Sequence, residues 1–177
     1  MFDLQMLRKL PGKMVWDTVE SPVGQLTVLA SDKGVRAILY EGEMAEQVQV
    51  DLWRAEGHLV VDGAVRQLKG YFEGELRIFD LPLDLYGTDF QKRVWQLLLE
   101  IPFGKTQTYG DLAREMGGVG ASQAVGAANG NNAVAIVVPC HRVIGASGDL
   151  TGYAGGMDKK EFLLRHEGVI QEQLVLF

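Results

Sequence analysis

The residues best suited to chemistry lie together in the segment Pro139-Cys-His-Arg-Val143. Cys140 is the only cysteine of the 177-residue chain, and His141 follows it directly. A thiolate is the reactive form of cysteine, and a nearby imidazole lowers the pKa of the thiol or acts as its base. Adjacent side chains do not face each other on a strand or helix, so the pair needs a sharp turn or one bridging water. The alternative is a cysteine that serves only as a small buried hydrophobe.

Glu167 is the second candidate, because it lies where a carboxylate is out of place. The sequence predicts a helix from Met157 that ends at Gly168 as its C-cap, after the glycine-rich loop 151–156. In the last turn of a helix the macrodipole disfavours an anion. A cationic partner would offset this cost, and His141 is the candidate, although a solvated surface glutamate is the alternative. Lys159 and Lys160, at the other end of the helix, also oppose the dipole.

The element expected to deliver Cys140 is a buried strand. Residues 133–138 form a continuous apolar run that is typical of such a strand. Pro139 favours an extended conformation at Val138 and ends the strand. This arrangement would hold Cys140 at the end of a rigid element.

The second half of the chain otherwise predicts helices. A capping box at Thr88-Asp-Phe-Gln91 begins a helix that Pro102 and Gly104 end. A second short helix begins at Thr108-Tyr-Gly-Asp111 and ends at the two glycines 117–118, and a third runs from about 121 to 131. Two short helices joined by a glycine-containing turn are typical of a helix-turn-helix unit. The third stretch is uncharged and built from small residues, which favours either close packing in a core or contact with a narrow nucleic-acid minor groove.

The first half predicts strands and turns and carries no apparent catalytic group. Period-two or apolar runs over 14–20, 25–30 and 34–40, separated by turn residues, indicate a β-meander. Residues 64–71 predict a short helix, and 78–83 predict an edge strand, the only kind that tolerates Pro82. His58 stands alone among charged residues and is interpreted as structural.

Composition sets the class of protein. The hydrophobic fraction of 47% supports a folded core, and no apolar run reaches the roughly 20 residues needed to span a bilayer. One cysteine excludes an internal disulfide and a thiolate zinc cluster, and it favours a reducing, intracellular location. The net charge of −6 argues against binding nucleic acid by bulk charge. The charge is uneven, however: residues 1–87 carry nine Lys and Arg against fourteen Asp and Glu, whereas residues 88–177 carry eight against nine.

The segment Pro139-Cys-His-Arg-Val143, with the apolar run before it and Gly-Tyr-Ala-Gly-Gly and Leu-Leu-Arg-His-Glu-Gly after it, resembles the O6-alkylguanine-DNA alkyltransferases. The resemblance is dense from Phe90 to Gly168 and loose over the first half. It implies an α+β fold with two domains. Residues 1–86 would form a variable N-terminal α/β domain with a small antiparallel sheet. Residues 87–177 would form a mostly helical C-terminal domain that contains the helix-turn-helix, the DNA-binding surface and the active site.

The function that this resemblance implies is direct DNA repair. Members of the family transfer an alkyl group irreversibly, once per molecule, from O6 of guanine to a cysteine, and the same is expected for O4 of thymine. Carried over, Cys140 is the acceptor, His141 is the general base acting through a water, and Glu167 orients His141. Asn132 matches the family's hinge asparagine. Tyr109 matches the tyrosine that stacks by the flipped nucleotide and donates a proton to guanine N3.

The resemblance also implies how DNA is held. The family enters the minor groove with the second helix of its helix-turn-helix and flips the target base out of the duplex. Further residues expected to contact substrate or DNA are Gln123, Ala127, Ala128, Arg142, Val143, Tyr153, Ala154 and Gly155. Gln123 stands where the family usually has an arginine that fills the gap left by the base, which predicts weaker DNA affinity or slower flipping. Ala154 stands where some members carry a serine aimed at O6, and the smaller residue would admit bulkier alkyl groups.

The expected partner is double-stranded DNA containing O6-alkylguanine, bound by a cytoplasmic monomer without metal, cofactor or membrane. Three other functions stay open. The first is a lesion-binding protein whose transfer is impaired by Gln123, although such relatives have lost the cysteine. The second is a cysteine hydrolase that uses Cys140, His141 and Glu167. The third is a redox sensor, for which the chain has no resolving cysteine.

Overall fold

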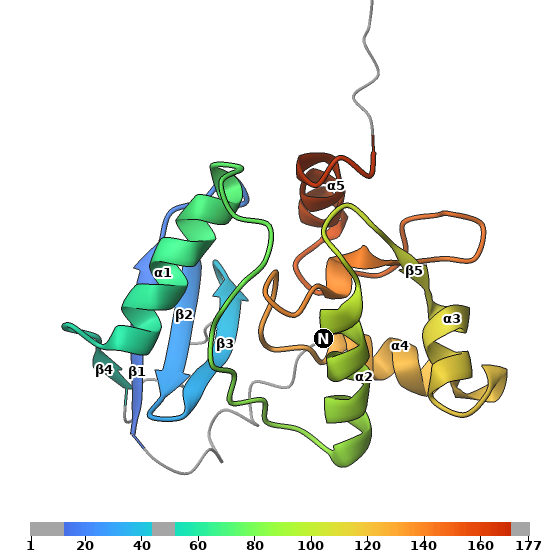
Figure 1. Ribbon diagram of the computed structural model, residues 1–177, viewed down its shortest axis with the longest axis horizontal. Coiled ribbons are helices and arrows are strands. Elements are labelled where there is room, and N and C mark those ends of the chain that lie inside the picture. Colours follow the sequence, from blue (N-terminus) through green and yellow to red (C-terminus); the bar gives the residue numbers. More distant parts are fainter. Residues whose placement is uncertain (1–12, 44–51, 171–177) are drawn as a thin grey trace, which may run out of the picture.

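The sheet of the N-terminal half is a three-stranded meander with a fourth strand added at one edge. The computed structural model describes residues 13–43 and 52–170, and Figure 1 shows the sheet on one side of the molecule. Strands β1 (Met14–Val19), β2 (Leu26–Ser31) and β3 (Gly34–Tyr40) are antiparallel, which confirms the predicted meander. Strand β4 (Leu52–Arg54) pairs parallel to β1, giving the order β3-β2-β1-β4. The expectation of a purely antiparallel sheet was therefore wrong for this strand.

Helix α1 covers one face of this sheet. It runs over Leu59–Phe72, so it begins five residues before the predicted helix at residue 64. The helix buries Val61, Ala64, Leu68 and Tyr71, and it packs on β1, β2 and β3. Every residue of β2 and β3 is buried as well. A sheet covered on both faces explains why these two strands read as apolar runs rather than as strict alternation.

The outer edge of β3 is covered by two segments that come from later in the chain. Val35 accepts from the amide of Asp84 and donates to Pro82, an isolated bridge in place of the edge strand predicted over 78–83. Pro82 has no amide hydrogen, so a longer ladder does not form there. Farther along the same edge, the amide of Ile38 donates to the carbonyl of Ala133 at 2.8 Å. This second contact joins the sheet to the segment that precedes Cys140.

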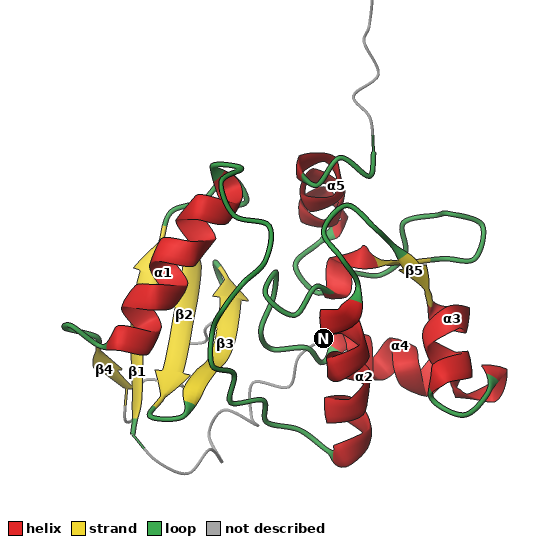
Figure 2. Cartoon of the chain, viewed as in Figure 1, coloured by secondary structure: helices red, strands yellow, loops and turns green. Residues whose placement is uncertain are grey.

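The C-terminal half is built from helices, coloured red in Figure 2. They are α2 (Asp89–Glu100), α3 (Tyr109–Glu115), α4 (Ser122–Gly130) and α5 (Met157–His166). Short strands β5 (Gln107–Thr108) and β6 (Val143–Ile144) pair in parallel. Capping boxes begin α2 at Thr88 and α3 at Thr108, and α3 packs on α4 as the helix-turn-helix prediction requires. Among the described residues, no helix has the length and apolar character needed to cross a membrane.

The predicted strand over 133–138 was wrong. The run is buried from Val134 onward, but it forms successive turns with a single bridge, between Val134 and Ile38. The amide of Val138 donates to the carbonyl of Val134 at 2.9 Å, which closes a loop rather than extending a ladder. Ile136 has φ of +70°, a left-handed conformation that is costly for a β-branched residue. The apolar run predicted burial correctly, but burial alone does not determine whether the backbone forms a strand or a series of turns.

Helix α2 supplies a test of local capping. The hydroxyl of Thr88 accepts from the amide of Gln91, and the Gln91 side chain accepts from the amide of Thr88. We expect Thr88→Ala to lower the free energy of unfolding by about 1 kcal/mol, because the amide of Gln91 loses its acceptor while the backbone amide of residue 88 keeps its own. Urea unfolding followed by circular dichroism measures this change. The control is Thr106→Ala, whose hydroxyl caps no helix, and an equal loss in both variants would contradict the assignment.

Candidate active site

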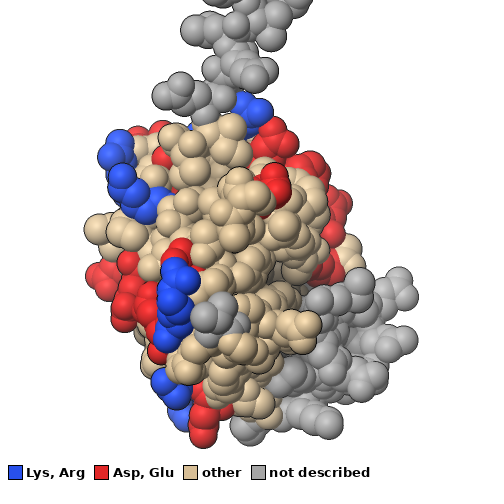
Figure 3. All heavy atoms as spheres, turned by 90° about the vertical axis from the view of Figure 1, so that its right-hand side faces the viewer, with Lys and Arg blue, Asp and Glu red and all other residues tan. Residues whose placement is uncertain are grey.

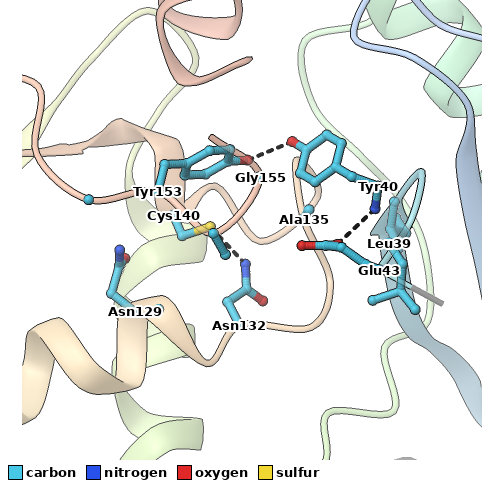
Figure 4. Close-up of a pocket in the computed structure, with 13 residues that line it drawn as sticks. Leu39, Tyr40, Glu43, Asn129, Asn132, Ala135, Cys140, Tyr153 and Gly155 are labelled. Atoms are coloured by element: carbon cyan, nitrogen blue, oxygen red, sulfur yellow. Dashed lines mark hydrogen bonds between the residues drawn. The ribbon is translucent and has the colours of Figure 1, made fainter. Parts of the chain in front are cut away.

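Cys140 begins a one-turn 3₁₀ helix, η4 (Cys140–Arg142), directly after Pro139. Its side chain is 5% exposed. The Nδ2 group of Asn132 donates to the sulfur at 3.1 Å and to the carbonyl of Val138 at 2.8 Å, while Oδ1 of Asn132 accepts from the amide of Val134 at 3.0 Å. One asparagine therefore fixes both ends of the turn that carries the thiol (Figure 4). The predicted hinge position of Asn132 lies in direct contact with Cys140.

The surroundings of Cys140 keep the thiol protonated in this closed form. Burial raises the pKa of Cys140 above its ordinary value, and the hydrogen bond from Asn132 and the charge of Lys160 lower it only in part. The sequence had indicated a pKa lowered by the adjacent imidazole. The pKa instead is raised, because loss of solvation in the closed pocket outweighs the favourable contacts.

His141 and Glu167 lie in direct hydrogen-bond contact, the pairing that the sequence indicated. Nε2 of His141 lies 2.8 Å from Oε1 of Glu167, and His141 is 0% exposed. Arg142 binds the same carboxylate through Nε at 2.8 Å and Nη2 at 2.9 Å. The hydroxyl of Tyr71 donates to it at 2.8 Å, and the amide of Gly104 donates at 3.2 Å. Glu167 thus joins α5 to α1, to the loop after α2 and to η4.

The charges around Glu167 set the protonation states of this centre. Burial opposes ionisation of Glu167, but the hydrogen bonds and charges of His141 and Arg142 outweigh it and lower its pKa to about 2. Burial also lowers the pKa of His141, so the imidazole is neutral at pH 7. A neutral imidazole that donates from Nε2 to a carboxylate carries its lone pair on Nδ1. Nδ1 of His141 has no hydrogen-bond partner among residues 13–43 and 52–170.

The sequence did not reveal the role of Lys160. This lysine is fully buried, and its ammonium donates to the carbonyls of Val143 at 2.6 Å and Thr151 at 2.7 Å. Burial lowers its pKa to about 8. The lysine therefore ties the strand after the cysteine to the glycine-rich loop. No sequence pattern distinguishes Lys160 from Lys159, which is only half-buried, because both lysines lie in the first turn of the same helix.

A small pocket beside Cys140 is closed by the N-terminal half of the chain. The cavity measures about 20 Å³, room for a single water-sized group. Tyr40, at the end of β3, bonds its hydroxyl to that of Tyr153 at 2.6 Å, above Cys140 in Figure 4. A Cβ on Gly155 would lie 2.4 Å from the Tyr40 ring, so glycine is required for this close approach. A group much larger than one water molecule does not fit in this cavity while Tyr40 and residues 152–155 are in contact.

Other residues expected in the site divide between the pocket and the surface. Tyr153, Ala154 and Gly155 line the pocket, and Tyr109 is half-buried near it. Gln123 and Ala127 are exposed on α4, as a contact surface requires. Figure 3 shows the end of the molecule at which α3 and α4 lie. The centre of that face is uncharged, and most of its Lys and Arg side chains lie toward one edge.

Two predicted contact residues do not lie on this surface. Ala128 is 2% exposed and packs toward α2, where its carbonyl accepts from the indole of Trp95 at 2.9 Å. Arg142 is buried too, and it binds Glu167 and the carbonyl of Ile101. Their predicted contacts with DNA or substrate stay predictions, and the side chains of both residues have internal roles here: Ala128 packs against a neighbouring helix, and Arg142 supplies the cation that a buried carboxylate needs. Val143 contributes a buried carbonyl that is already bound by Lys160.

Comparison with known protein families finds two matches, one for each half of the chain. The profile of the 6-O-methylguanine DNA methyltransferase ribonuclease-like domain matches residues 14–85, and the profile of the DNA-binding domain of the same family matches residues 89–169. The chain therefore belongs to the 6-O-methylguanine DNA methyltransferase family. Within the described residues, no cluster of His, Cys, Asp and Glu has the geometry to hold a metal ion.

Curated relatives and solved structures are similar over nearly the whole chain. A Mycobacterium tuberculosis (strain H37Rv) methylated-DNA–protein-cysteine methyltransferase is 51% identical over 85% of this chain and 90% of its own length. A Methanosarcina acetivorans protein of the same name is 48% identical over 88% of this chain and 99% of its own. The crystal structure of M. tuberculosis O6-methylguanine methyltransferase matches with a TM-score of 0.80 at 46% identity, covering 91% and 97% of the two chains. The M. tuberculosis protein in complex with DNA matches with a TM-score of 0.78 at 47% identity, covering 86% and 92%.

The lowered pKa of His141 gives a pH prediction. The unfolded chain binds a proton at an ordinary histidine pKa, near 6.5, whereas the native state does not, so the free energy of unfolding falls as pH drops below about 6.5. The slope due to this group is at most about 1.4 kcal/mol per pH unit. Glu167 adds a second loss as pH falls from its ordinary pKa near 4.5 toward about 2. Urea unfolding between pH 7.5 and 5.5 measures the first loss, which His141→Gln should diminish; an unchanged slope in that variant would refute the assignment.

The hydroxyl pair of Tyr40 and Tyr153 gives a second prediction. We expect Tyr40→Phe to speed the reaction of Cys140 with iodoacetamide about fivefold, because one hydrogen bond less holds the pocket closed. Intact-protein mass against time measures the rate in the folded protein. Tyr86→Phe, at an exposed tyrosine, is the matched control. Equal labelling rates in the two variants would show that the hydroxyl contact does not limit access.

Proposed function

We propose that this chain repairs DNA by transferring an alkyl group from O6 of guanine, and from O4 of thymine, to the sulfur of Cys140. The observation that carries the proposal is the buried contact of Glu167 with His141, the residue directly after the cysteine. The pair supplies a neutral base of defined tautomer beside a thiol that burial keeps protonated. The names of the relatives support the same chemistry. The presence of the cysteine disfavours a protein that only binds lesions.

The reaction balances as a single displacement. The Cys140 thiol gives its proton through one water to Nδ1 of His141, and Glu167 stabilises the imidazolium that results. The thiolate attacks the alkyl carbon, the new S–C bond forms and the C–O6 bond breaks. The electron pair passes to the purine, and Tyr109 donates a proton to N3, so that guanine leaves in a neutral form. The proton held on His141 then returns through solvent to the phenolate of Tyr109. The thioether has no route back to a thiol, and each molecule therefore acts once.

The remaining parts of the chain are assigned to positioning. Asn132 and Lys160 hold the two segments on either side of Cys140, from Val134 to Val143 and on to Thr151. The exposed, uncharged face of α4 that includes Ala127 enters the minor groove, and Gln123 fills the gap left by the flipped base. The pocket walls formed by Tyr153, Ala154 and Gly155 contact the alkylated base. Residues 1–86 and 87–177 form the two domains, and the chain acts as a monomer in the cytoplasm.

Intact-protein mass after mixing with a duplex that contains O6-methylguanine tests the function. We expect a gain of one methyl group per chain that then stops, and no gain in Cys140→Ala. Repeated turnover, or a gain in the Cys140→Ala control, would contradict suicidal transfer to this sulfur. Tight binding of the lesion without any mass gain would favour the lesion-binding alternative.

The exposed Gln123 gives a prediction about DNA binding. We expect Gln123→Arg to tighten DNA binding or raise the transfer rate, because a guanidinium stacks and hydrogen-bonds better than an amide and adds a phosphate attraction. Fluorescence anisotropy on a lesion duplex and single-turnover transfer measure the two effects. The neighbouring exposed position supplies the control, Ala124→Arg, which adds the same charge outside the gap. Identical behaviour of both variants would assign any gain to charge alone.

A further inference from the structure

Asn129 carries an unexplained polar group beside the cysteine. It lies in the last turn of α4, is 3% exposed, and lines the same pocket as Cys140. Figure 4 shows its amide extending upward from the helix on the Cys140 side of the pocket. Nδ2 of Asn129 donates to the hydroxyl of Tyr109 at 3.5 Å. Oδ1 is inaccessible and has no hydrogen-bond partner among the residues that the structure describes.

Two neighbouring asparagines show that this is not a general property of the helix end. Oδ1 of Asn132 accepts from the amide of Val134, and Nδ2 of Asn131 donates to the carbonyl of Ala127. Each of these side-chain amides forms a hydrogen bond with the backbone at or just after the end of α4. A buried carbonyl oxygen left without a donor is costly, and native structures keep few of them. We therefore expect a hydrogen-bond donor of the substrate to pair with Oδ1 of Asn129.

The contact with Tyr109 defines what that donor must be. Because Asn129 donates to the tyrosine oxygen, the hydroxyl proton of Tyr109 is directed away from the amide. The other hydrogen-bond partner of this hydroxyl is the side chain of Thr151, and an acceptor on an entering base would take the place of Thr151. A hydroxyl donor and a carbonyl acceptor then lie side by side. The minor-groove edge of guanine presents the complementary pair, since its N3 is an acceptor and its 2-amino group, on the adjoining carbon, is a donor.

We propose that Asn129 is a base-recognition residue: its Oδ1 accepts from the 2-amino group of the alkylated guanine while its Nδ2 positions the hydroxyl of Tyr109. This inference rests on the proposed function, because it requires an alkylguanine in the pocket. The oxygen is covered until Tyr40 and loop 152–155 separate, so the contact forms as the base enters. Thymine presents an acceptor, O2, at the corresponding edge, so Asn129 also favours guanine over thymine.

The test removes the 2-amino group from the substrate and the carbonyl from the protein in turn. Single-turnover methyl transfer is measured with duplexes that contain either O6-methylguanine or O6-methylhypoxanthine, which differ only in that amino group. We expect the unaltered protein to react about five- to tenfold faster with O6-methylguanine, as one buried hydrogen bond implies. In Asn129→Met, which fills similar space without the carboxamide, the ratio of the two rates should fall to about one.

Matched variants separate recognition from damage to the fold. Asn131→Met, on the same helix end but outside the pocket, should keep the ratio of the unaltered protein. Asn129→Asp keeps an acceptor and should also keep the preference for O6-methylguanine over O6-methylhypoxanthine. If Asn129→Met does not unfold cooperatively, Asn129→Ala takes its place in the comparison. An equal penalty for the missing amino group with and without Asn129 would overturn the inference. If the unaltered protein takes no methyl from O6-methylguanine, the proposed function fails first, and the inference fails with it.

Discussion

A single buried carboxylate holds this structure and its chemistry together. Glu167 receives hydrogen bonds from Tyr71 on α1, from Gly104 after α2, and from both His141 and Arg142 beside the cysteine. An anion out of water must be paired and fully hydrogen-bonded, and breaking such a pair is strongly destabilising. The requirement to satisfy this one group therefore fixes how the last helix, the cysteine turn and the N-terminal helix meet. The tautomer of His141 follows from the same requirement.

The N-terminal half is part of the active site as well as its support. The edge of β3 pairs with residues 82–84 and with the segment before Cys140, and its last residue, Tyr40, closes the pocket against Tyr153. An edge strand covered in this way is protected from pairing with other chains. Burial in this pocket also raises the pKa of Cys140, so the thiol is protonated here. Access and reactivity are thus linked by the same contacts.

The sequence predicted the parts of the molecule that depend on local chemistry. The capping boxes at Thr88 and Thr108, the meander and the pairing of His141 with Glu167 follow from patterns within a few residues or from a charge that needs a partner. The path over 133–138 could not be predicted, because Ile136 adopts a conformation that its side chain disfavours. The same holds for Lys160, Tyr40 and Asn129, whose roles depend on contacts made by distant segments. The ion pair of Arg142 was not predicted either, because its carboxylate partner lies 25 residues away.

The most direct test of this account is the single-turnover transfer rate of Glu167→Gln on an O6-methylguanine duplex, with DNA affinity and urea unfolding measured on the same sample. Glutamine keeps the size of the side chain but removes the charge that orients His141 and stabilises its protonated form. Tyr71→Phe, which removes one hydrogen bond to the same group without changing its charge, is the reference variant. We predict that Glu167→Gln loses about 100-fold or more in transfer rate, the scale of general base catalysis, while it still binds DNA. A folded Glu167→Gln protein that transfers methyl as fast as Tyr71→Phe would contradict the account.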